Sequence, residues 1–448
     1  MQQPPITWSG LMVLAGLLAG SPAVTALEIE PGVGVGLLYT DNATLSANDE
    51  EDDLIVVGYA GAQFDENTGP FRLNAEAELI HLHYTGNTYS NQNYPGLRLT
   101  AGYEQIRDRL DWQVQNYFTQ TLGNSLDGTT PDNIQNTNVF TFGPTIRFPI
   151  SGRQTITVNP QYRNFYYEDV GDDNQQYALS ANWFYGMYPT MGVSLDGSMT
   201  ETVYDGGDNS ATDYTRTTAH AGLSGTTARS DYSLNLGGTD IDRDKAGSTS
   251  GFSGNLTWSY NLSGHSSARV YLSSDITDTG NLLLNSQTNP DDGDYSNVQT
   301  SNDVVRNNIL RLTYRREDAT LNTEVWGEFR DLNYEGDQGG QGDQGGQSDR
   351  DVREVGANLD YRVTAALTAG ILGRYTWTKE TDTDRKDKEY SVTGTIGYQL
   401  TRKLRTNLDL RYQDQDSKGG LGNEYSEFSS FVRLVYGFAR VERPGRGR

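Results

Sequence analysis

The sequence contains no cysteine, and no run of apolar residues reaches the ~20 that a helix needs to cross a bilayer. The first absence excludes disulfide bonds, and the second excludes a helical membrane protein. Apolar residues form only 35% of the 448 residues, too few for the cores of soluble domains in a chain of this length. Two classes of protein fit: a disordered chain, or a membrane β-barrel in which half of each strand faces water.

A two-residue period favours the barrel over disorder. Residues 71–79 alternate apolar and polar side chains, and the same alternation recurs at 97–104, 140–148, 252–262, 355–363 and 404–412. Tyrosine (28 residues) also outnumbers phenylalanine (13) and clusters near the predicted strand ends, as interfacial aromatic residues do. We therefore expect the apolar set to face lipid and the polar set to face a lumen. Because lipid satisfies no backbone hydrogen bonds, the sheet must close.

Long and short connections alternate between the predicted strands. Short turns separate ten long, polar connections, which are Asp41–Asp53, Thr85–Tyr94, Leu122–Thr137, Glu168–Gln175, Asp205–Asp213, Asp240–Thr249, Thr277–Asp303, Glu335–Arg350, Glu380–Lys388 and Gln413–Glu424. Outer-membrane barrels have long external loops and short periplasmic turns. The pattern predicts an all-β, antiparallel, up-and-down transmembrane barrel of about 20 strands (18–22) over residues 27–438, with both termini periplasmic.

The ends of the chain carry export signals. The apolar run Gly10–Gly20, followed by Val24 and Ala26, predicts a signal peptide over residues 1–26 with cleavage after Ala26. Alternating apolar residues that end at Phe438 resemble the segment read by outer-membrane barrel assembly machinery, and residues 439–448 form a short tail. The predicted location is the outer membrane of a Gram-negative bacterium.

The residues that could perform chemistry are few. His81 and His83 share a face at a strand end, but their neighbours are poor metal ligands, and His220 with Ser224 is too widely spaced along one strand for proton transfer. Acidic residues at 49–53 and 291–294 could bind divalent cations, although solvated loops are the simpler interpretation, as for the Gly/Gln/Asp repeat at 336–347. We predict no catalytic residues, no metal site and no cofactor.

Charged side chains instead concentrate on the predicted lumenal face. The expected pore-lining residues are Arg72, Arg98, Arg147, Arg163, Arg269, Arg311, Arg315, Arg330, Arg362, Arg374, Arg405, Arg411, Glu76, Glu78, Glu324 and Glu328, with Arg433 on the same phase. Two interpretations remain open. The charges either form ion pairs that stiffen the wall, or they line a path for a carboxylate- or phosphate-bearing solute.

Two short motifs resemble those of a known family. The segment Ile29-Glu30-Pro31 leading to Tyr39-Thr40-Asp41-Asn42, and the turn Arg107–Asp111, are similar to the β-barrel porins found beside exopolysaccharide and PEP-CTERM protein-sorting gene sets in Gram-negative bacteria. The resemblance implies a location in the outer membrane and an association with surface polysaccharide, but no active site.

These observations predict a passive conduit linked to exopolysaccharide export or surface assembly. The alternatives are a general small-solute porin and a structural or receptor barrel without an open pore. The expected partners are outer-membrane lipid, lipopolysaccharide and the assembly machinery, together with exopolysaccharide and periplasmic export components. No nucleic-acid partner is expected.

Overall fold

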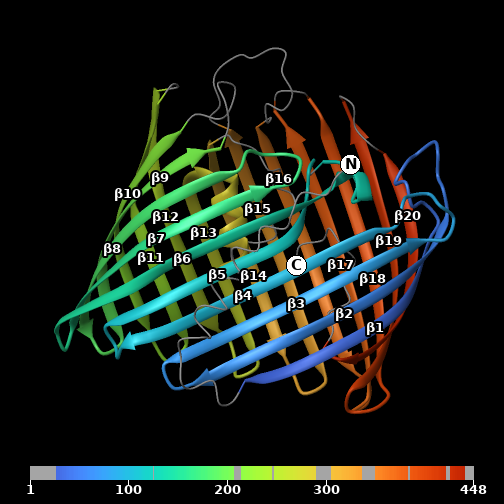
Figure 1. Ribbon diagram of the computed structural model, residues 1–448, viewed down its shortest axis with the longest axis horizontal. Helices are drawn as coiled ribbons and strands as arrows, with labels where there is room; N and C mark the ends of the chain where they lie inside the picture. The colour runs from blue at the N-terminus through green and yellow to red at the C-terminus, as the bar shows by residue number, and fades with distance from the viewer. Residues whose placement is uncertain are drawn as a thin grey trace.

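A computed structural model describes residues 27–124, 126–205, 213–244, 247–288, 304–334, 349–381, 384–419 and 424–438. The predicted signal peptide, the C-terminal tail, the acidic cluster at 291–294 and the repeat at 336–347 lie outside these residues. The described chain forms one closed ring of 20 antiparallel strands (Figure 1). This confirms the predicted fold class and strand number. No helix among the described residues is long and apolar enough to cross a membrane.

The strands follow one another around the ring in chain order. They are β1 (Glu28–Thr40), β2 (Asp53–Thr68), β3 (Phe71–Tyr84), β4 (Gln92–Ile106), β5 (Leu110–Leu122), β6 (Ile134–Ser151), β7 (Gln154–Tyr167), β8 (Asn174–Tyr188), β9 (Met191–Tyr204), β10 (Tyr214–Thr226), β11 (Ser230–Arg243), β12 (Gly247–Asn261), β13 (Ser266–Asp278), β14 (Val304–Glu317), β15 (Leu321–Tyr334), β16 (Arg350–Arg362), β17 (Leu367–Glu380), β18 (Lys386–Gln399), β19 (Leu404–Lys418) and β20 (Tyr425–Gly437). Within the described ranges two helices interrupt the pattern, η1 (Pro131–Asn133) and α2 (Thr279–Thr288).

Side chains alternate between the two faces of the ring as the sequence predicts. In β16, Val355 and Leu359 are 58% and 40% exposed on the outer face, while Asn358 points inward and donates to Asp360. The outer face therefore presents an apolar band that matches the hydrocarbon of a bilayer.

The ring closes through the motif at the end of β1. The β1–β20 pair runs from Gly32↔Gly437 to Thr40↔Ser429. Three further hydrogen bonds join the two strands beyond the last of these pairs. The Thr40 hydroxyl donates to Glu427 (2.8 Å), the Asn42 side-chain amide donates to the Ser426 carbonyl (2.9 Å), and the Asp41 carboxylate accepts from the Phe428 backbone amide (2.8 Å). Thr40-Asp41-Asn42, part of the motif behind the family resemblance, thus fastens the first strand to the last.

Strands extend further into the predicted long connections than the sequence indicated. The segment Asp240–Thr249 is not a long loop: β11 continues to Arg243 and β12 begins at Gly247, paired through Asp240↔Ser250. The β19 strand likewise continues to Lys418. The polar residues of these segments predict loops, but they alternate with inward side chains such as Ile241, which is fully buried.

Candidate constriction of the lumen

The outer end of β13 leaves the wall and bends into the barrel. Pairing between β12 and β13 stops at Gly254↔Ser274, although β12 continues to pair with β11 as far as Gly247. The β13–β14 pair continues to Asp278↔Val304, so both strands bend together. The freed end crosses the inner faces of β11 and β12 and reaches β10.

Arg216 of β10 holds this bent end in place. Its Nε donates to the backbone carbonyl of Ile276 (2.8 Å), and its Nη2 pairs with the Asp275 carboxylate (2.7 Å). Backbone groups that lose sheet partners need replacements, and this guanidinium supplies one. The Ile276 side chain is fully buried in a cluster with Tyr204, Tyr214, Ile241 and Val304.

Helix α2 continues from the bent end and lies inside the ring of strands (Figure 1). Asp278 precedes the helix, and its Oδ1 accepts the backbone N–H of Asn281 (2.8 Å), which is N-cap geometry. Leu282 packs against Tyr271, Val305, Ile309 and Leu332 on β13–β15. The next two leucines, Leu283 and Leu284, pack against Tyr117, Val139, Phe165 and Tyr167 on β5–β7. The helix therefore bridges two separate parts of the inner wall.

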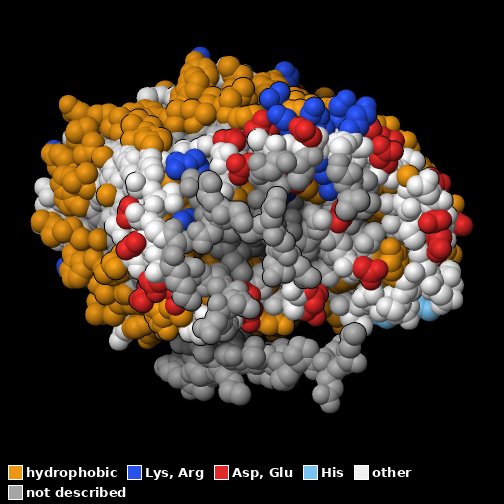
Figure 2. All heavy atoms as spheres, turned by 90° about the horizontal axis from the view of Figure 1, so that it is seen from above, with side chains coloured by type: hydrophobic (Ala, Val, Ile, Leu, Met, Phe, Trp, Pro, Cys, Tyr) orange, Lys and Arg blue, Asp and Glu red, His pale blue; other side chains and the backbone are white. Residues whose placement is uncertain are grey.

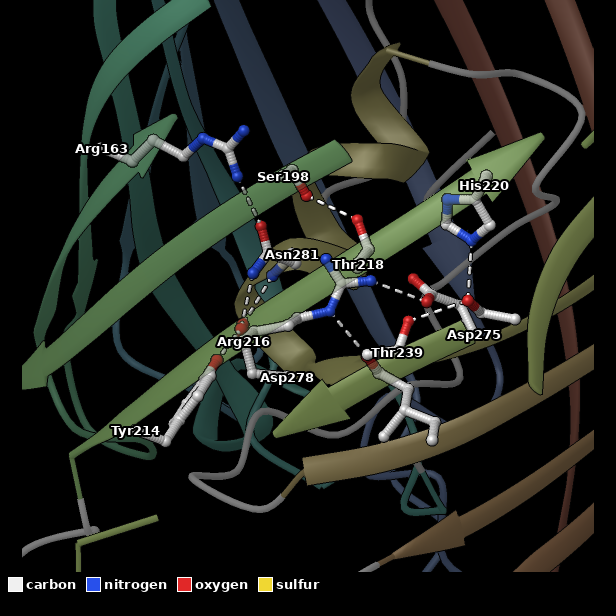
Figure 3. A network of polar contacts seen from close by, with 12 residues as sticks. Arg163, Ser198, Tyr214, Arg216, Thr218, His220, Thr239, Asp275, Asp278 and Asn281 are labelled. Atoms are coloured by element: carbon white, nitrogen blue, oxygen red, sulfur yellow. Dashed lines mark hydrogen bonds and ion pairs between the residues drawn. The ribbon is translucent and has the colours of Figure 1, made fainter. Parts of the chain in front are cut away.

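A buried polar network fixes the start of α2 (Figure 3). The second oxygen of Asp278 accepts from the Tyr214 hydroxyl, from the Asn281 amide and from Gln176 (3.3 Å). Arg163 of β7 donates to the other end of the Asn281 amide (2.9 Å). Of these residues, only Arg163 was predicted from the sequence as a site residue.

A second segment also folds into the lumen, and we call its described residues, 123–124 and 126–133, the β5–β6 loop. It is braced internally by Asn133, whose amide donates to the carbonyls of Asn124 (2.8 Å) and Gly128 (3.1 Å). Its far side meets distant strands: the Leu126 carbonyl accepts from Arg385, just before β18, and from Gln415 of β19 (2.9 and 3.3 Å).

Asp127 in the β5–β6 loop is half-buried. Burial raises the pKa of its carboxyl above the ordinary value, and the nearby charge of Arg385 opposes that rise. Its Oδ2 accepts from the Asn124 amide (2.7 Å).

The predicted pore-lining residues fall on the inner face, and many are paired. The ion pairs are Arg72–Asp111 (2.7 Å), Arg98–Glu76 (3.9 Å), Arg311–Glu328 (3.1 Å), Arg330–Glu328 (2.8 Å), Arg315–Glu324 (2.9 Å), Arg374–Glu354 (3.7 Å) and Arg433–Asp409 (3.2 Å). The strand register also places Arg147, Arg269, Arg362, Arg405, Arg411 and Glu78 on this face. That these side chains line an open path stays a prediction.

The histidines make simple polar contacts. His81 and His83 lie on the outer face and bond Asn93 and Asn91 (2.9 and 3.0 Å). His220 bonds the Ser253 hydroxyl of β12 (2.7 Å) rather than Ser224, and Ser253 is only 1% exposed. Within the described ranges no group of acidic or histidine side chains could hold a metal ion.

Comparison with known proteins finds a family model that matches the last part of the chain. Residues 352–437 match the family model described as "Putative beta-barrel porin 2", which confirms a porin resemblance for β16–β20 but not for the two motifs nearer the N-terminus. No curated protein sequence matches the chain.

Similar solved structures are outer-membrane barrels. The siderophore receptor PirA from Acinetobacter baumannii is 9% identical, with 93% of this chain and 81% of that chain covered and a TM-score of 0.50. OccK2 (OpdF) from Pseudomonas aeruginosa, solved with glucuronate, is 10% identical, with 92% and 98% covered and a TM-score of 0.41. The family match and the closed 20-stranded ring identify an outer-membrane, porin-like β-barrel.

Proposed function

We propose that this outer-membrane barrel is a passive conduit whose passage is narrowed by α2 and the β5–β6 loop. The observation that carries the proposal is the attachment of α2 to both β5–β7 and β13–β15 through buried leucines. A helix held on two sides divides the lumen and restricts what passes, while the charged inner wall suits hydrophilic solutes.

The cargo that the sequence resemblance favours is an exopolysaccharide or its precursor. A general small-solute porin is the main competing role, and a closed structural or receptor barrel is the third. We propose no catalytic role, because the Ser253 hydroxyl beside His220 is only 1% exposed and so cannot meet a substrate.

Planar-bilayer recording of the purified barrel tests the conduit. We expect a small, ohmic conductance with weak anion preference, because arginines outnumber carboxylates among the predicted lining residues. A folded barrel without conductance would reject both the exopolysaccharide and the porin roles in their ungated form. If the barrel conducts, but deleting its gene leaves surface polysaccharide unchanged, the porin role survives.

A basic surface on the outer wall supports lipopolysaccharide as a partner. Arg353, Lys379, Lys386, Lys388 and Lys418 project outward near the long-loop ends of β16–β19, and Figure 2 shows a blue patch at the rim. These include four of the chain's six lysines, the others being Lys245 and Lys403. Lys379 lies opposite Lys386, which lies opposite Lys418, an unfavourable arrangement of like charges that is offset in part by the ion pair of Lys418 with Asp416 (3.7 Å) and by Asp351, which lies opposite Lys379.

We propose that this surface lies at the level of the lipopolysaccharide phosphates in the outer leaflet and binds them. Changing Lys379, Lys386 and Lys418 together to Gln should reduce the lipopolysaccharide that co-purifies with the barrel, measured by native mass spectrometry. The control is Lys403→Gln, in the short turn between β18 and β19. Equal retention by both variants would contradict the proposal.

A further inference from the structure

A cavity of about 260 Å³ lies beneath the β5–β6 loop, against the inner face of β1–β4 and β18–β20. Thr129, Pro131 and Ile134 form one side of it. The opposite side is apolar, formed by Leu38, Val57, Leu82 and Phe431 among others. This is unusual for the inner wall, which carries polar and charged side chains over most of its area. An apolar, walled space in a polar lumen is a typical small-molecule site.

One cation facing this cavity has no partner. Arg411 of β19 is 8% exposed, and within the described chain its Nε and Nη2 atoms have no hydrogen-bond acceptor. The two carboxylates near Arg411 in the strand register have other partners: Asp409, which also lines the cavity, pairs with Arg433 (3.2 Å), and Glu427 accepts from Thr40 (2.8 Å). A buried guanidinium without an acceptor is strongly unfavourable, so the site favours an anion.

A second donor lies across the same cavity. The Tyr94 hydroxyl of β4 is buried, lines the cavity and has no hydrogen-bond partner among the described residues. Tyr94 and Arg411 are therefore two unsatisfied polar groups on either side of an apolar surface. Such groups are rare in folded proteins and require an explanation.

We propose that this cavity binds an amphipathic carboxylate. In the proposed complex the Arg411 side chain turns toward the cavity that it lines, and its planar fork of N–H donors pairs with both oxygens of the carboxylate. The carbon skeleton of the ligand would lie on Leu38, Val57 and Phe431, and Tyr94 would donate to a further oxygen. A phosphate or sulfate fits less well, because the apolar surface would strip water from a more strongly hydrated anion.

Isothermal titration calorimetry on the purified barrel tests the site with phenylacetate as the probe. We expect saturable binding that weakens at least about tenfold with phenylacetamide, which lacks the charge, and with acetate, which lacks the ring. Arg411→Gln should weaken phenylacetate binding to a similar extent, while Arg405→Gln, on the same strand and face, should leave it unchanged.

Two further variants keep the test decisive if Arg411→Gln fails to fold. Arg411→Lys retains the charge but loses the fork, and Val57→Trp fills the apolar side; each should weaken binding. Equal affinity for phenylacetate and phenylacetamide, or no saturable binding to the folded wild-type barrel, would overturn the proposal. Binding requires no open path, so a barrel that binds phenylacetate without conducting would reject the conduit and retain the site.

Discussion

Two segments occupy the lumen, and different interactions hold them. Helix α2 continues directly from β13, and it is fixed by the carboxylate of Asp278 and by leucines packed on two parts of the wall. The β5–β6 loop is braced mainly by its own Asn133, and it meets the far wall through the carbonyl of Leu126. Beneath the loop lies a cavity, whereas α2 packs directly against side chains.

Because of these different attachments, we expect α2 to be a fixed constriction and the β5–β6 loop to be an adjustable one. Displacing α2 would expose three leucines and remove both hydrogen bonds that Asn281 donates to Asp278. Displacing the loop would cost the two hydrogen bonds at Leu126 and would relieve a partly desolvated Asp127. We therefore expect α2 to set the minimum cross-section and the loop to respond to ligands and pH.

The largest effect is expected from removing the apolar anchors of α2. Changing Leu282, Leu283 and Leu284 together to Ser removes contacts worth ~2–5 kcal/mol per leucine truncated in a typical core. The helix should leave the lumen, and single-channel conductance should rise several-fold while the barrel stays folded. Ser198→Ala, which breaks only a wall bond to Thr218 (2.6 Å), is the control. Unchanged conductance in the folded triple variant would mean that α2 does not limit passage.

A smaller effect is expected from changing either of two inward aspartates, Asp278 or Asp127, to Asn. The two changes should differ in their effect on local amide hydrogen exchange. Asp278→Asn weakens the cap and the network at α2, at ~1–3 kcal/mol for a buried hydrogen-bonded group. Amide hydrogen exchange over residues 279–288 should become faster. Asp127→Asn removes a charge that burial disfavours, so exchange over residues 123–133 should stay the same or become slower. Faster exchange at both sites would remove the distinction between them.

The smallest effect is the response of the β5–β6 loop to pH. The pKa of Asp127 is raised in the folded protein, so its neutral form is favoured there. The stabilisation is present below the ordinary pKa of the carboxyl and is lost as pH rises through the raised value. After correction for intrinsic rates, exchange over residues 123–133 should slow as pH falls through this window. Asp127→Asn should abolish that response, and its persistence would assign it to another group.

The period of two residues predicted the strands and their faces, because a barrel wall repeats one simple constraint, and the alternation of long and short connections predicted the strand number. The same rule could not predict α2, since Asp278–Leu284 falls in Thr277–Asp303, whose composition predicts a long polar connection. A signal was available: Leu282-Leu283-Leu284 is a conspicuously apolar run for an exposed loop. The inward bend of β13 depends on Arg216, which is distant in sequence and reveals its role only in three dimensions.

The cavity beneath the β5–β6 loop could also be predicted only in part from the sequence. In β3 the apolar positions change face between Leu79 and Ile80, so that Ile80, Leu82 and Tyr84 point inward. This phase change is visible in the sequence and marks the apolar part of the inner wall. Arg411 was predicted to face the lumen, but its lack of an acceptor depends on how Asp409 and Glu427 are engaged, which no spacing rule gives.

The early separation of β13 from β12 also affects the mechanics of the wall. A closed ring of backbone hydrogen bonds resists deformation. This ring is interrupted at Gly247–Ser253 of β12, which has no β13 partner in the described residues. The guanidinium of Arg306 lies against this stretch, so close to Gly251 that a Cβ there would come within 2.6 Å of it. Side chains can slide over one another where a hydrogen-bonded ladder cannot. Under lateral pressure in the membrane, we expect the ring to flatten along this seam.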